Sequence, residues 1–234
     1  MGEGMAHYAR EGAASDTSYA INTLADFDLY CHYVAGIVGE GLSALFSASG
    51  KEREDLGHML TLSNSMGLML QKTNIMRDFR EDLEDGRFFW PREIWSKYAN
   101  DPKAFYMKQD PEQQKKALFA LSEMILDALS HATDCLDYLS LLKNQSVFAF
   151  CAIPQVMAIA TLEECFMNPN VFKKNVKIRK SLAVHVSRIF LLSPSLLAAF
   201  ADNKYAILHS HSSFKKLSIP EKSQGSSQCT DDAF

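Results

Sequence analysis

The chain has 234 residues, of which 47% are hydrophobic and 22% charged, and its formal net charge is −4. A chain of this length and composition can bury one sizeable core. Its weak negative charge gives no general argument for nucleic acid or an anionic membrane as a partner, and we expect no nucleic-acid binding. Its five cysteines form no Cys-x-x-Cys pair, so we expect reduced, mostly buried thiols in a cytosol-facing protein.

Signals for secretion and membrane insertion are weak. The N-terminal residues do not combine a charged start, an apolar stretch and a cleavage site, so we expect no secretory signal. The most apolar late stretch, residues 189–201, is shorter than the roughly 20 residues that a bilayer core of about 30 Å requires. We therefore expect no transmembrane anchor, and a cytosolic location if the chain is complete.

The spacing of apolar residues predicts long helices. Alternating strand patterns and Asn-Gly hairpin turns are absent from the sequence, which therefore predicts an all-α fold. In chain order, the expected helices cover residues 18–47, 56–85, 111–143 and 145–167, and residues 101–109 form a connector. Pro111 suits a first helical turn. Residues 210–234, rich in Ser, Lys and Gln, are expected to form a disordered polar tail.

Two tyrosines and three glycines stand out in the first helix. Tyr30 and Tyr33 lie about one turn apart, a spacing that is more often found in a core than in a catalytic site. Gly36, Gly39 and Gly41 follow them, and each glycine inside a helix costs roughly 0.8–1 kcal/mol relative to alanine. The glycines therefore predict the close approach of a neighbouring helix or of a ligand.

A polar string in the second helix carries oxygen ligands at helical spacing. Asn74, Asp78 and Asp82 recur every four residues and so project from one face, flanked by Gln71 and Glu81. Like charges at this spacing disfavour an isolated helix by roughly 0.2–0.5 kcal/mol per pair. Mg²⁺, however, is typically held by one or two carboxylates together with waters and substrate phosphates. The alternative is a solvated acidic face whose negative charge is neutralised by three arginines, Arg77, Arg80 and Arg87.

Apolar residues surround this string. They precede it and continue between its polar positions: Leu60, Leu62, Met66, Leu68, Met69, Leu70, Ile75, Met76 and Phe79. Methionine suits the wall of a pocket because its unbranched side chain adapts to irregular ligands. The pattern therefore predicts the mouth of a pocket for a lipid that carries a phosphate.

Two further features lie in the last predicted helix and beyond it. Pro154 removes a backbone hydrogen bond to the Phe150 carbonyl and so kinks the helix, with Gln155 beside it. The kink either fits core packing or exposes Phe150 and this carbonyl to a pocket, where an aromatic face can stabilise a cation. Residues 173–180 hold five basic side chains in eight, a pattern that most often forms a solvated surface.

The strings described above resemble motifs of one known family. Residues 64–82 and 86–91 closely resemble the second aspartate-rich motif of squalene synthases. Residues 30–39, 144–161 and 171–180 resemble further blocks of that family, in the same order. The tyrosine block alone fits the wider squalene/phytoene synthase group. The strings Phe-Trp-Pro, Ala-Ile-Pro-Gln and Lys-Ile-Arg-Lys narrow the resemblance to squalene synthase.

The resemblance covers residues 1–182 and implies a partial catalytic domain with an isoprenoid-synthase-type helical bundle. Nothing before Asn64 matches the family's first aspartate-rich motif, and the C-terminal membrane anchor of the family has no counterpart. Residues 183–209 are expected to form a divergent helical segment before the polar tail. The chain thus resembles the middle of a squalene synthase with a divergent end.

The family resemblance implies an activity: the head-to-head condensation of two farnesyl diphosphates to presqualene diphosphate, and reduction of this intermediate with NADPH to squalene. Mg²⁺ is the implied metal, and the implied place is the cytosolic face of the endoplasmic reticulum membrane. We expect a monomer. This chain alone is expected to turn over little farnesyl diphosphate, because it carries only one of the family's two carboxylate clusters.

The resemblance also assigns roles to individual residues. The catalytic residues would be Tyr30 in the first half-reaction, with Tyr33 as second choice, and Phe150 in the second half-reaction. Asp78 and Asp82 would bind the metal, with Glu81 in support. The substrate-binding residues would be Arg77, Arg87, Gln71, Met66, Leu70 and Gln155. NADPH would be bound by Asn74 and by Lys177 and Arg179 of a mobile flap.

Two alternatives remain at this point. A phytoene synthase-like prenyltransferase would make no use of NADPH, and the Lys-Ile-Arg and Phe-Trp-Pro strings argue against it. A non-catalytic fragment or paralogue would fold poorly or pair with a full-length enzyme through exposed core faces. An assay with farnesyl diphosphate, Mg²⁺ and NADPH discriminates among the three.

Overall fold

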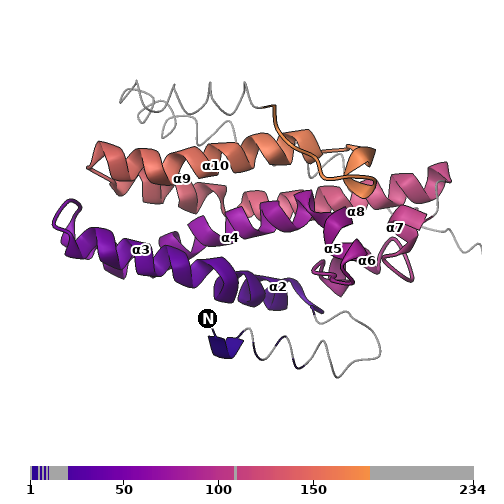
Figure 1. Ribbon diagram of the computed structural model, residues 1–234, viewed down its shortest axis with the longest axis horizontal. Coiled ribbons are helices and arrows are strands. Elements are labelled where there is room, and N and C mark those ends of the chain that lie inside the picture. The colour runs from indigo at the N-terminus through magenta and orange to yellow at the C-terminus, as the bar shows by residue number, and fades with distance from the viewer. Residues whose placement is uncertain are drawn as a thin grey trace, which may run out of the picture.

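The computed structural model describes residues 2–4, 6, 8, 10, 21–107 and 110–179 (Figure 1). The predicted segments 183–209 and 210–234, the apolar stretch 189–201 and Cys229 lie outside these residues. Within the described residues the fold is all-α, as predicted.

The helices follow the predicted order, with interruptions that the sequence did not indicate. They are α2 (Leu24–Cys31), the π-helical segment η1 (His32–Gly36), α3 (Ile37–Ala48), the 3₁₀ segment η2 (Glu54–His58), α4 (Leu60–Arg77), α5 (Phe79–Glu84), α6 (Arg92–Trp95), α7 (Ala104–Met107), α8 (Pro111–Ser130), α9 (Ala132–Leu141), α10 (Gln145–Cys165) and the 3₁₀ segment η3 (Pro169–Phe172). The predicted second and third helices are each divided, at Asp78 and at His131. The predicted connector 101–109 contains the short helix α7.

Side-chain caps explain where three of the helices begin. Thr23 accepts a hydrogen bond from the Asp26 amide and forms a capping box with it at the start of α2. Asp110 caps α8, in which Pro111 occupies the first turn as predicted. Asn144 accepts hydrogen bonds from two amides at the start of α10. These caps satisfy amide groups that would otherwise lack partners.

Helix α4 is the central element of the bundle. It contacts α2, α3, α8, α9 and α10, and Figure 1 shows it between α2 and α3 on one side and α9 and α10 on the other. Its side chains Leu68, Met69, Ile75 and Met76 are at most 4% exposed. Four polar residues of α4 are buried as well, namely Ser63, Ser65, Lys72 and Thr73. Because α4 also carries the start of the polar string, the core itself fixes the position of the candidate site.

Glycines permit α3 and α4 to lie unusually close together. A Cβ atom at Gly39 would lie 3.2 Å from the carbonyl carbon of Ser63 and closer still to its oxygen. A Cβ atom at Gly67 would lie 2.8 Å from the amide nitrogen of Gly36. The predicted close approach of a neighbouring helix is therefore confirmed at Gly36 and Gly39. At Gly41 the alternative of a neighbouring helix is wrong, because a Cβ atom there would meet nothing within 4 Å, and the alternative of a ligand stays a prediction.

A buried charge cluster joins α2, α4 and α8. The fully buried ammonium group of Lys72 lies 2.5 Å from a carboxylate oxygen of Asp28 and 2.7 Å from one of Asp127. It also lies 2.9 Å from Nε2 of His131. Burial raises the pKa of Asp127 and lowers the pKa of His131 to about 4, so the imidazole is neutral and accepts a hydrogen bond from the ammonium group. Paired and hydrogen-bonded in this way, a lysine can lie in the core.

Two described stretches are long and apolar enough to span a membrane when judged by length and composition alone: residues 24–48 and helix α10. Both pack against α4 within the bundle, and core helices pass the same test. The four described cysteines, Cys31, Cys135, Cys151 and Cys165, are free thiols, and all but Cys151 are buried. This confirms the expectation of reduced, mostly buried thiols for the described part of the chain.

Candidate functional site

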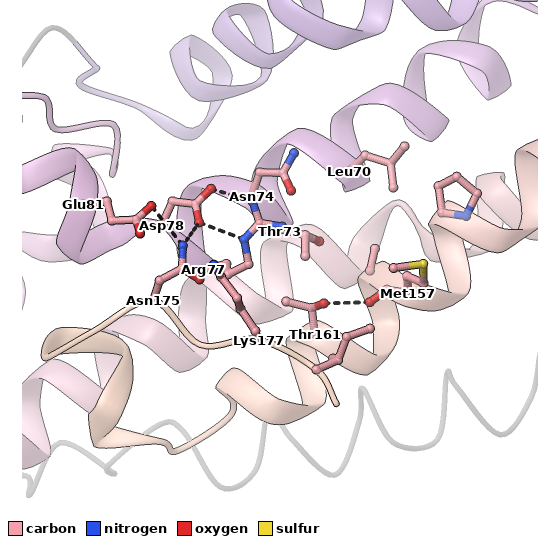
Figure 2. A pocket seen from close by; sticks show the side chains of 13 residues that line it. Leu70, Thr73, Asn74, Arg77, Asp78, Glu81, Met157, Thr161, Asn175 and Lys177 are labelled. Carbon is pink, nitrogen blue, oxygen red and sulfur yellow. Dashed lines mark hydrogen bonds and ion pairs between the residues drawn. The ribbon is translucent and has the colours of Figure 1, made fainter. Parts of the chain in front are cut away.

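A cavity of about 700 Å³ lies where α4 meets α5, opposite α10 (Figure 2). Its wall is formed by Leu70, Thr73, Asn74, Arg77, Asp78, Glu81, Pro154, Met157, Ala158, Thr161, Asn175, Lys177 and Ile178. Asn74 and Asp78, which the four-residue spacing placed on one face, both reach this cavity. The polar wall therefore comes from α4, α5 and the segment that follows η3, and the apolar wall comes largely from α10.

Two carboxylates in this wall converge on one amide group. Asn175 donates hydrogen bonds from Nδ2 to Oδ1 of Asp78 at 2.7 Å and to Oε2 of Glu81 at 3.0 Å. Arg77 binds both oxygens of Asp78, at 2.8 Å and 2.6 Å, and this hydrogen bonding raises the pKa of Arg77. Figure 2 shows Asn175 reaching across from its segment to the two acidic side chains. The carboxylates of Asp78 and Glu81 can thus contact a common atom.

The same donor set fits a divalent cation. Two carboxylates that converge on one point are hard oxygen ligands of the kind that Mg²⁺ prefers, and waters and phosphate oxygens complete its shell. Oδ1 of Asn175 is a third oxygen close by, buried and without a hydrogen-bond partner among the described residues. Groups of three or more His, Cys, Asp or Glu side chains that could hold a metal do not occur in the described ranges. A site of this kind would therefore depend on ligands besides the carboxylates.

Asp82 does not line this cavity, whereas Asn74 and Asp78 do. That Asp82 shares a metal-binding face with them stays a prediction. The two helices α4 and α5 are divided at Asp78, where φ is −94° and ψ is 10°. Helical hydrogen bonds still join the Asp78 amide to the Asn74 carbonyl and the Asp82 amide to the Asp78 carbonyl. Asp82 instead accepts a hydrogen bond from Arg87 at 3.0 Å, and burial raises the pKa of its carboxyl group. The string therefore supplies Asp78 and Glu81 to the large cavity and Asp82 to a different environment.

That second environment contains Tyr30. Its ring is 7% exposed and stacks on Phe89, with ring centres 5.1 Å apart. Burial raises the pKa of Tyr30 to about 12, and among nearby charges Asp82 raises this pKa whereas Arg87 lowers it. Tyr30 is therefore a protonated phenol at neutral pH, close to one acidic and one basic side chain. Tyr33 is partly exposed and lies beside His32, with ring centres 5.6 Å apart.

A second cavity, of about 260 Å³, is predominantly apolar. It is lined by Val34, Ala35, Val38, Gly39, Leu42, Phe46, Ser63, Met66, Gly67, Leu70, Tyr138, Phe150, Cys151, Pro154 and Gln155. Phe150 is 58% exposed and contacts Phe46 edge to face, with ring centres 6.2 Å apart. Leu70 and Pro154 belong to the walls of both cavities. The polar cavity and the apolar cavity are therefore neighbours that share Pro154 of α10 and Leu70 of α4.

The remaining predicted residues divide between these cavities and the surface. Asn74 and Lys177, both assigned to NADPH, line the large cavity. Lys177 and Arg179 are exposed, as expected for a basic run, but Arg179 is not part of the cavity wall. Gln71 is partly buried and lines neither cavity.

Several residues of the large cavity were not predicted as site residues, among them Met157, Thr161 and Asn175. Asn175 is the only uncharged polar residue in the basic run 173–180, which is the one sequence signal that singles it out. Met157 and Thr161 lie one turn apart in α10, and Thr161 donates its hydroxyl to the Met157 carbonyl at 2.7 Å. Such helical spacing in an apolar segment carries no functional signal of its own.

The described residues thus form an all-α bundle in which a polar and an apolar cavity adjoin. The sequence pattern of the family described as squalene/phytoene synthase matches residues 1–181, and the chain belongs to this family. The chain is 56% identical over 186 residues to the squalene synthase of Schizosaccharomyces pombe, an alignment that covers 80% of this chain and 40% of that protein. It is 46% identical over 213 residues to squalene synthase ERG9 of Candida albicans, covering 91% of this chain and 47% of that protein.

Solved structures agree with the family assignment. Two structures described as complexes of TcSQS, one with the ligand E5700 and one with BPH1237, are each 39% identical to the chain. The first has a TM-score of 0.73 and covers 93% of this chain and 67% of the solved one, and the second has a TM-score of 0.77 with 92% and 64% covered. The chain thus has the isoprenoid-synthase helical fold, and it spans 40% of the length of the relative from S. pombe and 47% of that from C. albicans.

Proposed function

We propose that this chain carries the central part of a squalene synthase, which joins two farnesyl diphosphates to presqualene diphosphate and reduces this intermediate to squalene with NADPH. The observation that carries the proposal is the pair of adjoining cavities, one edged by Asp78, Glu81 and Arg77 and the other almost entirely apolar. A prenyl diphosphate has the matching halves: a polyanionic head and an apolar chain. Leu70 and Pro154, common to both walls, lie where head and chain would meet.

The polar cavity would hold the diphosphate. Asp78 and Glu81 would bind Mg²⁺, and Asn175 Oδ1 lies near enough to contribute if its amide turns. A guanidinium group such as that of Arg77 suits phosphate because its donors form a fixed fork. When bound, Mg²⁺ supplies the positive charge that lets diphosphate depart, and NADPH supplies the hydride. The residues of this chain would orient the diphosphate and keep water from the apolar side.

Tyr30 would act on a proton. With a pKa of about 12 its phenol keeps its hydrogen at neutral pH, so that it can donate a hydrogen bond to a departing oxygen. Asp82 accepts a hydrogen bond from Arg87 beside this tyrosine, and the pair would hold the local charge balanced while a proton moves. Asp82 is thus proposed to support Tyr30 rather than to share a metal with Asp78.

Lys177, Arg179 and Asn74 are proposed to bind NADPH. Asn74 and Lys177 already face one cavity, and the exposure of Lys177 and Arg179 leaves both charges free to meet phosphates. By the same resemblance we place the protein, as a monomer, at the cytosolic face of the endoplasmic reticulum membrane.

Calorimetric titration of the purified 234-residue chain with farnesyl diphosphate tests the proposal without requiring turnover. We expect binding that strengthens with Mg²⁺, and we expect Asp78→Asn to remove this dependence while leaving the helical circular dichroism unchanged. Glu84→Gln is the matched control, because Glu84 is exposed, lies outside both cavities and pairs with Arg80. An affinity for farnesyl diphosphate that does not depend on Mg²⁺, or that both substitutions change equally, would contradict the proposed site. A parallel assay with NADPH reports whether any product is squalene or an unreduced prenyl hydrocarbon.

A further inference from the structure

Asn175 joins the basic run 173–180 to the two carboxylates of the polar cavity. Its Nδ2 donates hydrogen bonds to Oδ1 of Asp78 at 2.7 Å and to Oε2 of Glu81 at 3.0 Å. Lys177, two positions later in the run, lines the same cavity, and Figure 2 shows it on the same stretch of chain as Asn175. This one amide therefore links the acidic edge of the cavity to a residue that is proposed to bind NADPH.

The stretch of chain around Lys177 depends on side-chain contacts for its position. Residues 175–179 have no regular secondary structure, so the hydrogen bonds of a helix or a sheet do not hold them. The apolar anchors on either side of Asn175 are Phe172, which is 5% exposed, and Val176, which is 7% exposed. Lys177 itself is exposed. The contact of Asn175 with the two carboxylates thus fixes where this stretch meets the cavity.

The amide of Asn175 has two ends of opposite character. Its NH₂ end carries positive hydrogens and suits the two carboxylates that it faces. A cation between Asp78 and Glu81 would meet these hydrogens, so the amide has to turn or to withdraw when a cation binds. Turning presents Oδ1, a hard oxygen ligand of the kind that Mg²⁺ prefers. Oδ1 lies buried without a hydrogen-bond partner among the described residues, so the turn leaves one end of the amide unpaired in either orientation. Withdrawal would also expose the neighbouring Val176, which favours the turn.

We propose that Asn175 is a positioning residue that makes the place of Lys177 depend on the metal. When a cation binds, the hydrogen bonds to Asp78 and Glu81 are exchanged for a contact between Oδ1 and the cation. This inference rests on the proposed function, in which these carboxylates bind Mg²⁺. The attraction between a cation and an amide dipole is stronger in a partly buried site than in water, so the metal should hold the stretch 175–179 more firmly than the hydrogen bonds do. Binding of the metal and placement of a cofactor-binding lysine thereby become one event.

Two measurements on the purified 234-residue chain test the inference without requiring turnover. Mn²⁺ stands in for Mg²⁺, and electron paramagnetic resonance of the free ion gives the metal affinity. Hydrogen exchange followed by mass spectrometry reports how firmly the stretch 175–179 is held. We expect saturating Mn²⁺ to slow exchange in this stretch about fivefold, which is the lower end of the usual coupling between two sites. Asn175→Ala should bind Mn²⁺ about tenfold more weakly, and in this variant Mn²⁺ should no longer slow the exchange.

Two further variants make the test specific. Asn175→Asp keeps an oxygen at this position and loses the donor, so it should retain both the Mn²⁺ affinity and the slowed exchange. Asn170→Ala is the control and should behave as the wild type, because Asn170 is exposed and lines neither cavity.

The possible results separate the inference from the proposed function. If Asn175→Ala binds Mn²⁺ as tightly as the wild type or more tightly, the cation merely displaces the amide, and the inference is overturned. Mn²⁺ binding to the wild type that leaves the exchange of residues 175–179 unchanged also overturns it and leaves the proposed function standing. This comparison needs no variant, so it decides even if Asn175→Ala does not fold. If the wild type binds no Mn²⁺, the proposed metal site is overturned, and the inference with it.

Discussion

The close contact between α3 and α4 leads to a prediction in which one substitution has opposite effects at two neighbouring positions. Gly39→Ala adds a Cβ atom inside contact distance of the Ser63 carbonyl group, which is backbone and cannot turn aside. Overpacking of this kind costs typically 1–3 kcal/mol, and rigid backbone on both sides favours the upper end. Alanine returns about 1 kcal/mol through its higher helix propensity. The expected net loss is about 2 kcal/mol in the free energy of unfolding.

Gly41→Ala serves as the matched control, since it lies in the same helix and its added Cβ atom meets nothing within 4 Å. Only the propensity term applies there, so this variant should be more stable than the wild type by about 0.8–1 kcal/mol. Urea unfolding followed by far-ultraviolet circular dichroism measures both free energies. If Gly39→Ala proves as stable as Gly41→Ala, the two helices do not lie as close as the structure shows, and the explanation for the glycines fails.

The other predictions concern buried charge and the basic run. Lys72→Met should lower the free energy of unfolding by about 3–5 kcal/mol, because it leaves Asp127 buried without its cation, and adding Asp127→Leu should restore part of the loss. Stability should also fall as the pH drops from 6.5 towards 4: the pKa of His131 is lowered to about 4 in the folded chain, so the unfolded chain takes up this proton first. This loss should reach at most about 3 kcal/mol, and the raised pKa of Asp127 should offset part of it. Urea unfolding measures the stability at each pH, and a stability that does not change with pH would contradict the lowered pKa of His131. Replacing the counterparts of Lys177 and Arg179 with Ala in a full-length relative should halt the reaction at presqualene diphosphate, as product analysis would show, whereas equal loss of both half-reactions would contradict the assignment to NADPH.

Apolar periodicity predicted the helices because it reports which face is buried, and burial is what stabilises helices in proteins. It did not predict the divisions at Asp78 and His131. A break of one residue leaves the apolar spacing on either side nearly unchanged, so the pattern continues through it. Such a break depends on where the polar side chain finds its partners, and those partners are distant in sequence. Asp78 meets Asn175, 97 residues later, and His131 meets Lys72, 59 residues earlier.

The candidate site was predictable to the extent that it is local. Spacing within one helix placed Asn74 and Asp78 together, and resemblance to the family pointed to Phe150 and Lys177. Asp82 does not line the large cavity, and the division of the helix at Asp78 before it depends on backbone geometry that composition does not encode. Lys72 likewise lies within the polar string of the sequence, where nothing distinguishes it, although the structure buries it completely. Its burial required three partners from two other helices and the turn that follows α8.

The π-helical segment between α2 and α3 has a consequence for how the first long helix presents its side chains. Tyr30 and Gly39 are nine residues apart, and at about 100° per residue a continuous α-helix would place them on opposite sides. A π turn absorbs one extra residue, which leaves the equivalent of eight residues and brings the two positions to within about 80° of each other. The buried tyrosine and the glycine packed on α4 thus share a face because the helix widens between them, and insertion or deletion of one residue there would rotate Tyr30 away from its neighbours.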